Sequence, residues 1–270
     1  MKLFYCFIIL MAICILWSLI EAQLYIIKKV EIKSKKLNKD IKIVFISDIH
    51  YGNYYTASRL RRIISSINAL TPDIIIIGGD YLYNGKKSKF NKKFLEELFC
   101  QLSYLKSKKG IFTVIGNHEY NLSKNMDSIL EIIKRNNIIL LKNNTYEVIL
   151  ENKKLLIHGV DDLQKGHIDV QKLQIDKECL NIVISHNPDF FEECDIDFDI
   201  GLSGHTHGGQ INLFGIFAPI TESKYGQKYI KTLNRMENSI ILTTKGLGCT
   251  KLPIRFFSLP EIIELVVKNE

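Results

Sequence analysis

Apolar and polar positions alternate with different periods along the chain. Between residues 56 and 70, Leu60, Ile63, Ile64 and Ile67 recur at helical spacing, whereas other segments are short runs of β-branched residues typical of buried strands. The predicted helices are Thr56–Leu70, Phe90–Leu105 and Ser123–Arg135. The predicted strands are Ile41–Ser47, Asp73–Ile77, Ile111–Ile115, Asn181–Ser185, Asp199–Ser203, Ser239–Thr244 and Glu261–Val267, with a hairpin formed by Tyr146–Leu150 and Lys154–His158. This alternation predicts an α/β fold with two sheets.

The N-terminus is apolar over a length that can cross a bilayer. From Leu3 to Ile20 every residue except Ser18 is apolar or aromatic. We predict a membrane anchor over residues 1–24 and one folded domain over residues 25–270, because no linker or repeat interrupts the remainder. A cleaved signal peptide is the alternative, but its apolar region is normally shorter and this segment lacks a good cleavage site.

Lysines around the apolar segment bear on its orientation. Lys2 precedes the segment, and Lys28, Lys29, Lys33, Lys35 and Lys36 follow it. Positive residues favour the cytoplasmic side of a membrane span. We therefore expect a single-pass protein of the cell membrane whose folded domain faces the cytoplasm, although a long folded domain can override this bias.

Composition narrows the class of protein further. The chain has 270 residues, 46% hydrophobic and 24% charged, which disfavours disorder, collagen and a polytopic membrane protein. A net charge of +7 suits an anionic partner, but the lysines are scattered along the sequence, so charge alone decides nothing. Six cysteines without a Cys-x-x-Cys pair indicate neither a disulfide framework nor a thiolate zinc site.

Asp, Asn and His follow five of the predicted strands. These five loops contain Asp48-Ile49-His50, Gly78-Gly79-Asp80, Gly116-Asn117-His118-Glu119, Ser185-His186-Asn187-Pro188 and Gly204-His205-Thr206-His207-Gly208-Gly209. Ligands of α/β sheets gather at the carboxyl ends of strands, so these loops are candidates for one shared site.

The residue types in these loops suit divalent metal ions. Carboxylate, amide and imidazole groups are ligands for Mn, Fe, Co or Zn. Seven potential ligands exceed what one ion accepts, and a carboxylate can bridge two ions, a role for which Asp80 is the candidate. Two dications with two carboxylates and one hydroxide leave a formal charge of 4 − 2 − 1 = +1, which favours an anionic phosphoryl group as substrate.

Each part of the pattern has a structural explanation when taken alone. Asp48 can form an Asx-turn, Asp80 can belong to an ordinary turn, and His186 can be a hydrogen-bonded core histidine. His205 and His207 can be alternate residues of one strand. The ordered arrival of all five motifs at strand ends favours one functional site.

The ordered motif set from Asp48 to His207 resembles that of the calcineurin-like metallophosphoesterase superfamily. The resemblance implies a four-layer αββα sandwich of two mixed β-sheets flanked by helices. It implies one metal on Asp48, His50, Asp80 and His207 and a second on Asp80, Asn117, His186 and His205. His118 matches the family's histidine that stabilises the transition state or protonates the leaving oxygen while a metal-bridging hydroxide attacks phosphorus in line. A hydrogen-bonding role behind the ligands is the alternative for His118.

Departures from the superfamily's patterns narrow the substrate. Protein Ser/Thr phosphatases of this superfamily carry Gly-Asp-x-x-Asp-Arg-Gly, where Gly79–Gly85 lacks the Arg and the second Asp. A diester or pyrophosphate substrate is therefore favoured. Motifs after Gly208, including Pro253-Ile254-Arg255, resemble a bacterial single-anchor branch that includes UDP-diacylglucosamine hydrolase-like proteins. This branch implies a phosphate-containing substrate, possible lipid linkage, and a substrate contact or a structural salt bridge for Arg255.

Three other functions remain as alternatives. A nuclease of the same superfamily would need a basic groove, which the sequence does not show, so no nucleic acid partner is expected. A non-catalytic metal-binding scaffold would be expected to have lost ligands or His118. A serine hydrolase would need a Gly-x-Ser-x-Gly elbow, and the sequence contains none. Tyr81, Tyr83, Phe214 and Phe217 flank the motif loops and are interpreted either as core packing or as an apolar substrate surface.

Overall fold

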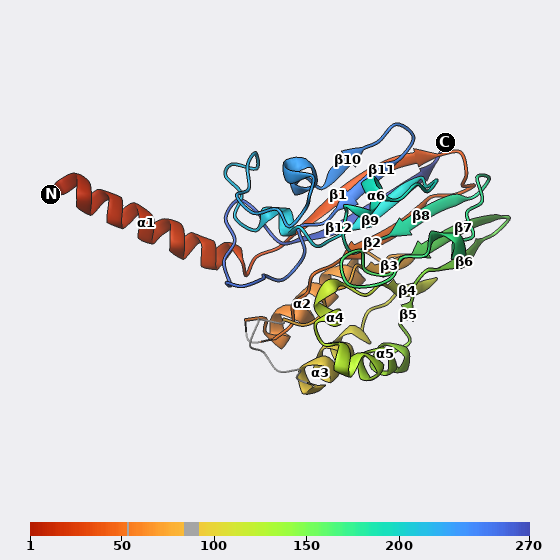
Figure 1. Cartoon of the computed structure of the whole chain (residues 1–270), viewed down its shortest axis with the longest axis horizontal. Coiled ribbons are helices and arrows are strands. Elements are labelled where there is room, and N and C mark those ends of the chain that lie inside the picture. The colour runs from red at the N-terminus through yellow and green to blue at the C-terminus, as the bar shows by residue number, and fades with distance from the viewer. Residues whose placement is uncertain (53, 84–91) are drawn as a thin grey trace.

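The computed structural model describes residues 1–52, 54–83 and 92–270 and contains two stacked sheets (Figure 1). Within the described residues each sheet has six strands, ordered β1-β12-β2-β3-β4-β5 and β10-β11-β9-β8-β7-β6. Both sheets mix parallel and antiparallel pairs, since β2, β3, β4 and β5 run parallel while β12 pairs with β2 antiparallel. The predicted α/β fold with two mixed sheets is confirmed.

The strands and helices have the following bounds. The first sheet contains β1 (Ile26–Ser34), β2 (Ile41–Ile46), β3 (Ile74–Ile77), β4 (Gly110–Thr113), β5 (Ile139–Leu140) and β12 (Glu261–Asn269). The second contains β6 (Asn144–Leu150), β7 (Lys153–Gly159), β8 (Leu180–Ile184), β9 (Ile200–Ser203), β10 (Leu233–Arg235) and β11 (Ile240–Thr243). The α-helices are α1 (Lys2–Glu21), α2 (Ala57–Ala69), α3 (Lys92–Leu102), α4 (Asn117–Tyr120), α5 (Met126–Arg135) and α6 (Phe190–Glu193). The 3₁₀ helices are η1 (Ser123–Asn125), η2 (Val170–Lys172), η3 (His207–Gly209) and η4 (Gly226–Ile230).

Three apolar clusters hold the layers together. The cluster between the sheets is built from strand residues such as Phe45, Ile76, Ile157 and Ile182, all fully buried. A second cluster joins the outer face of the first sheet to α2, α3 and α5. The third covers the outer face of the second sheet with α6, η4 and loop residues, so that outer layer has shorter helices than its counterpart.

Differences between predicted and observed elements have local causes. The strand β1 was not predicted, although Val30 and Ile32 alternate with charged residues at a period of two. The predicted helix over 123–135 begins as a 3₁₀ turn and becomes α-helical at Met126. The first two residues of the helix predicted over 90–105, and positions 84 and 85 of the Gly79–Gly85 stretch, lie outside the described residues.

The helix α1 projects away from the sheets and is exposed over most of its length (Figure 1). It is long and apolar enough to cross a membrane. In its last turn, however, Ser18 and Glu21 are buried, whereas Leu19 and Ile20 stay exposed. The carbonyl of Ser18 accepts a hydrogen bond from the backbone N–H of Arg255, and the carboxylate of Glu21 accepts those of Phe257 and Ser258 at 3.0 and 2.6 Å. The end of α1 is therefore hydrogen-bonded to the folded domain.

Candidate metal centre

The five motif loops converge at one end of the two sheets. The loops after β2, β3 and β4 carry Asp48 and His50, Asp80, and Asn117 with His118. The loops after the neighbouring strands β8 and β9 carry His186, and His205 with His207. The carboxylate of Asp48 accepts the backbone N–H of His205 at 3.1 Å, which ties the first sheet to the second at this point. Both sheets therefore contribute side chains to a single site.

The backbone of this site is strained in the same way at several residues. Asp48, His50, Asp80, His205 and His207 all have φ between 45° and 68°. Non-glycine residues rarely adopt this left-handed conformation, and it costs of order 1–3 kcal/mol each. Such strain persists only where surrounding contacts hold it, and it commonly marks functional sites. Nine other described non-glycine residues also have positive φ, so this conformation alone does not identify the ligands, but five of the seven predicted ligands share it.

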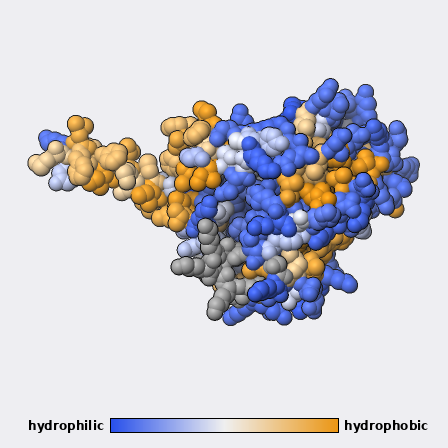
Figure 2. Space-filling model, in the orientation of Figure 1, coloured by the Kyte–Doolittle hydropathy of each residue, from blue (hydrophilic) through white to orange (hydrophobic). Residues whose placement is uncertain are grey.

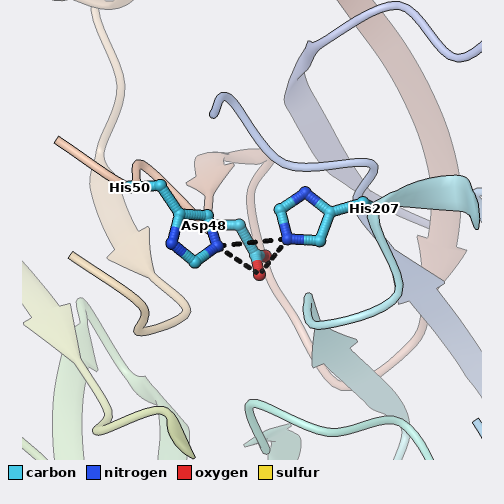
Figure 3. A group of neighbouring side chains, drawn as sticks. All are labelled: Asp48, His50 and His207. Atoms are coloured by element: carbon cyan, nitrogen blue, oxygen red, sulfur yellow. Dashed lines mark hydrogen bonds and ion pairs between the residues drawn. The ribbon is translucent and has the colours of Figure 1, made fainter. Parts of the chain in front are cut away.

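Asp48, His50 and His207 form the first group of donor atoms (Figure 3). The Nε2 atoms of the two rings lie 3.1 Å apart, and the Oδ1 atom of Asp48 lies 3.4 Å from His207 and 4.0 Å from His50. All three side chains are buried. Two imidazole nitrogens and a carboxylate oxygen thus point to one small volume.

Asn117, His186 and His205 form the second group. The Oδ1 atom of Asn117 lies 3.1 Å from His186 Nε2 and 3.1 Å from His205 Nδ1. His186 donates from Nδ1 to the carbonyl of Gly78 at 2.7 Å. Because that bond leaves the proton on Nδ1 in the neutral ring, Nε2 presents its lone pair to the site, as a metal-binding histidine requires.

The carboxylate of Asp80 lies between the two groups. Its Oδ2 atom is 3.6 Å from His50 Nε2, 3.3 Å from His186 Nε2 and 3.9 Å from His118 Nε2. The other oxygen, Oδ1, accepts the backbone N–H of His118 at 3.0 Å. The side chain of His118 is 20% exposed, whereas those of His50 and His186 are fully buried, so His118 faces the open side of the cluster.

Burial and neighbouring charges set the protonation of the cluster. Burial lowers the pKa of His50 and of His205 to about 3, and burial, His50 and the Arg255 cation hold the pKa of His207 well below its usual range. These rings are therefore neutral. Burial also disfavours the charged form of His186, but the carboxylates of Asp80 and Asp48 outweigh it and raise its pKa well above the usual range. The two carboxylates thus favour a cation in their midst.

The donor set and its spacing fit divalent metal ions. Ligand atoms at about 2.1 Å from one ion, at angles of about 90–110°, stand about 3.0–3.4 Å apart. The closest pairs of donor atoms in this cluster are separated by 3.1–3.6 Å. Carboxylate, amide and neutral imidazole groups match borderline divalent ions such as Mn, Fe, Co or Zn.

Close packing leaves no room for side chains beside the carboxylates. A Cβ atom at Gly204 would lie 2.2 Å from Asp48 Oδ2, and one at Gly116 would lie 2.3 Å from Asp80 Oδ1. Both positions belong to the loops predicted from the sequence. Glycine is required there because the ligand carboxylates occupy the space of a side chain.

Arg255 bonds to backbone carbonyls, and not to a substrate phosphate or a carboxylate as the sequence suggested. The side chain is fully buried, so it does not face a substrate in solution. Its guanidinium donates to backbone carbonyls rather than to a carboxylate, and it lies 3.3 Å from His207 Nδ1. The carbonyls belong to His207, Lys245, Gly246, Gly248 and Ser258. This arrangement holds the backbone around His207, so Arg255 positions a donor residue.

Glu119 is a second supporting residue, and the sequence analysis did not assign it a role. The buried carboxylate accepts the backbone N–H groups of Asp80, Tyr81 and Gly116 at 2.9–3.0 Å. It therefore joins the loops after β3 and β4. The sequence signal for this role is the position of Glu119 three residues after Gly116, where a glutamate commonly caps the start of a helix. The nearby Tyr81 is fully buried and donates to the carbonyl of Val114, so it is a packing residue.

Comparison with known proteins identifies the family. A profile of the calcineurin-like phosphoesterase family matches residues 41–209, which contain all seven predicted ligands and His118. The chain belongs to this family. The metallophosphoesterase YkuE of Bacillus subtilis is 29% identical over 233 residues, covering 84% of this chain and 79% of YkuE. The phosphodiesterase YaeI of Escherichia coli is 29% identical over 232 residues, covering 83% and 82% respectively.

A vertebrate relative extends the similarity to the apolar N-terminus. A zebrafish (Danio rerio) transmembrane protein with a metallophosphoesterase domain is 28% identical over 281 aligned positions, covering 97% of this chain and 62% of the relative. The calcineurin-like phosphoesterase is therefore a metal-dependent phosphoester hydrolase, and its N-terminal helix is compatible with a membrane anchor.

Proposed function

We propose that this calcineurin-like phosphoesterase hydrolyses phosphodiester or pyrophosphate bonds with two divalent metal ions. One ion would be held by Asp48, His50, Asp80 and His207, and the other by Asp80, Asn117, His186 and His205. The observation that carries the proposal is the position of Asp80, whose Oδ2 atom lies within 3.6 Å of a histidine Nε2 atom from each group.

The side chains of the site have separate roles in this proposal. The metal ions would activate the attacking water and offset the negative charge of the phosphoryl group. Asn117 contributes a neutral ligand, so Asp48 and Asp80 alone supply the negative charge of the proposed ligand set. His118, on the open side of the cluster, would donate a proton to the leaving oxygen, a role that requires reach toward the substrate.

We further propose that residues 1–24 anchor the enzyme in the cell membrane and that its substrate is a membrane or envelope phosphoester. An anchored enzyme meets an amphiphilic substrate in the layer where that substrate is concentrated. The support is the apolar helix α1 and the hydrogen bonds that join the buried Glu21 in its last turn to the domain that carries the site. The lysines after α1 favour the cytoplasmic side.

The test is turnover of an aryl phosphodiester by the full-length chain in detergent with added Mn. His118→Ala should lower kcat about 10²–10⁴-fold, the usual contribution of a general acid. Asp80→Asn should abolish turnover and reduce the number of Mn ions bound per chain. The exposed His167 gives a matched control, and His167→Ala should retain the activity of the parent.

Folding of each variant is checked by circular dichroism and thermal unfolding. Activity that survives both Asp80→Asn and His118→Ala in folded protein would contradict the assigned site. A parent enzyme that binds one metal ion per chain at saturation and still turns over would contradict the two-ion arrangement while leaving the hydrolase activity intact.

A further inference from the structure

A group of large apolar side chains is exposed around the end of α1. We call this group the apolar collar; its members are Phe214, Ile216, Phe217, Ile220, Leu252 and Phe257. Phe214 and Ile216 are 75% and 74% exposed. Figure 2 shows hydrophobic atoms gathered where α1 meets the domain, continuous with the hydrophobic surface of the helix. Exposed apolar groups of this kind mark binding surfaces.

Hydrogen bonds and a ring contact hold parts of the collar in place. Residues 213 to 217 form a tight turn, in which the N–H of Leu213 donates to the carbonyl of Phe217 at 2.7 Å. The ring of Phe214 lies against that of Phe257, with centroids 5.0 Å apart. The N–H of Phe257 donates to Glu21 in the last turn of α1. The collar and α1 are thus one connected structure.

This connection indicates which partner covers the collar. If α1 crosses the bilayer, the surface around its last turn lies at the level of the lipid headgroups and the first acyl carbons. Aromatic and aliphatic side chains are stabilised there because they leave water. The collar would lie at that depth, because Glu21 joins the backbone of its member Phe257 to the helix.

A cavity of about 210 Å³ lies between the collar and the metal centre. His207 and the collar residues Ile220 and Leu252 are among the residues that line this cavity, together with the polar residues Glu222 and Lys251. Ile211, Pro219 and Ile254 add further apolar surface. An apolar cavity that reaches a ligand residue of the metal centre suits the apolar portion of a phosphoester.

We propose that the apolar collar inserts into the lipid bilayer beside α1 and that the cavity behind it receives the apolar part of an amphiphilic phosphoester taken from the membrane. This inference rests on the proposed function, because it assigns the substrate class of the same metal centre. The phosphoryl group would lie at the metal centre, and the acyl or prenyl portion would extend through the collar toward the bilayer.

Fluorescence quenching tests insertion without using activity. The chain has one tryptophan, Trp17, so Trp17→Phe combined with Phe214→Trp places one fluorophore in the collar. The full-length variant is reconstituted in phosphatidylcholine vesicles with and without acyl-brominated lipid. We expect at least twofold stronger quenching than in the matched control, Trp17→Phe with Tyr104→Trp, because Tyr104 is an exposed aromatic residue that follows α3 and is not part of the collar. Equal quenching at both positions would overturn the proposed insertion.

Kinetics test whether the collar contributes to turnover of a lipid substrate. The double variant Phe214→Ser and Phe217→Ser should lower kcat/KM at least tenfold for hexadecyl 4-nitrophenyl phosphate in vesicles. The value for water-soluble ethyl 4-nitrophenyl phosphate should stay within twofold of the parent, because neither residue touches the metal centre. Equal losses on both substrates, or no loss on either, would overturn the proposal. A parent enzyme inactive on both esters would instead contradict the proposed function, and the quenching result would still decide the membrane contact.

Discussion

Replacing Arg255 by lysine tests whether this buried arginine positions His207. The guanidinium donates to five buried carbonyls, whereas a lysine ammonium has three donors at one point. The carbonyls of His207 and Gly246 also accept the backbone N–H groups of Gln210 and Glu261. The carbonyls that depend on the guanidinium are those of Lys245, Gly248 and Ser258. A lysine ammonium cannot span the positions that the planar guanidinium reaches, so we expect at least one of these three carbonyls to lose its partner. At about 1–3 kcal/mol for each unsatisfied group, Arg255→Lys should lower the free energy of unfolding by about 1–3 kcal/mol.

The same replacement should loosen the backbone that holds His207. Removing a group that orients a metal ligand typically lowers metal affinity about 10–100-fold. We therefore expect weaker Mn binding by isothermal titration calorimetry of folded, full-length protein. If Arg255 instead contacted a substrate phosphate, the variant would raise KM and keep its Mn affinity.

Arg59 provides the matched control for this experiment. It is also a buried arginine that donates to a carbonyl, that of Leu247 at 2.8 Å. Among the described residues its hydrogen bonds and its ring contact involve Leu24, Leu247 and Tyr55, none of which is a donor residue of the metal centre. Arg59→Lys can keep this bond, so we expect a smaller loss of stability and a Mn affinity within twofold of the parent. Equal losses of Mn affinity in the two variants, or none in Arg255→Lys, would refute the positioning role.

Four further predictions test separate parts of the structure. Chelation of the metal ions should destabilise the protein, by about 2.7 kcal/mol relative to Mn at one hundred times its Kd, and an unchanged Tm would contradict metal binding to the folded state. Gly204→Ala should weaken Mn binding, since its Cβ would lie 2.2 Å from Asp48 Oδ2; calorimetry that finds parental affinity would show that the loop adjusts. Burial lowers the pKa of His158, so its neutral ring stabilises the fold above the unfolded pKa of about 6.5, and this contribution is lost as pH falls below that value. The difference in urea stability between the parent and His158→Gln should therefore shrink by at most about 1.4 kcal/mol per pH unit below 6.5, and a difference independent of pH would refute this account. Exposed Cys100 should react with an impermeant maleimide only after cell lysis, with Cys100→Ser as the control, and labelling of intact cells would place the domain outside.

The sequence was sufficient to predict the main elements and the strand-end loops. Strands and helices of this fold depend on the spacing of apolar residues within about fifteen positions, which is visible in the sequence. The strand β1 was not predicted because four of its nine residues are charged and few apolar side chains alternate with them. It lies at the edge of its sheet, where Ile26 and Ile27 are exposed. The convergence of the five loops followed from their order and from the rule that parallel strands present their carboxyl ends at one edge.

The tertiary structure decided how residues distant in sequence act on one another. The sequence shows only that Arg255 is a charged residue. Its burial and its hydrogen bonds to five backbone carbonyls, which indicate a positioning role, are visible only in the folded structure. In the sequence, Glu21 is simply the polar residue that ends an apolar helix. The folded structure shows its hydrogen bonds to Phe257 and Ser258, which connect that helix to the apolar collar. Composition and order along the chain determined which chemistry was available. Burial, left-handed backbone and long-range hydrogen bonds depend on neighbours more than a hundred residues away, so the assembled fold alone determined where that chemistry lies.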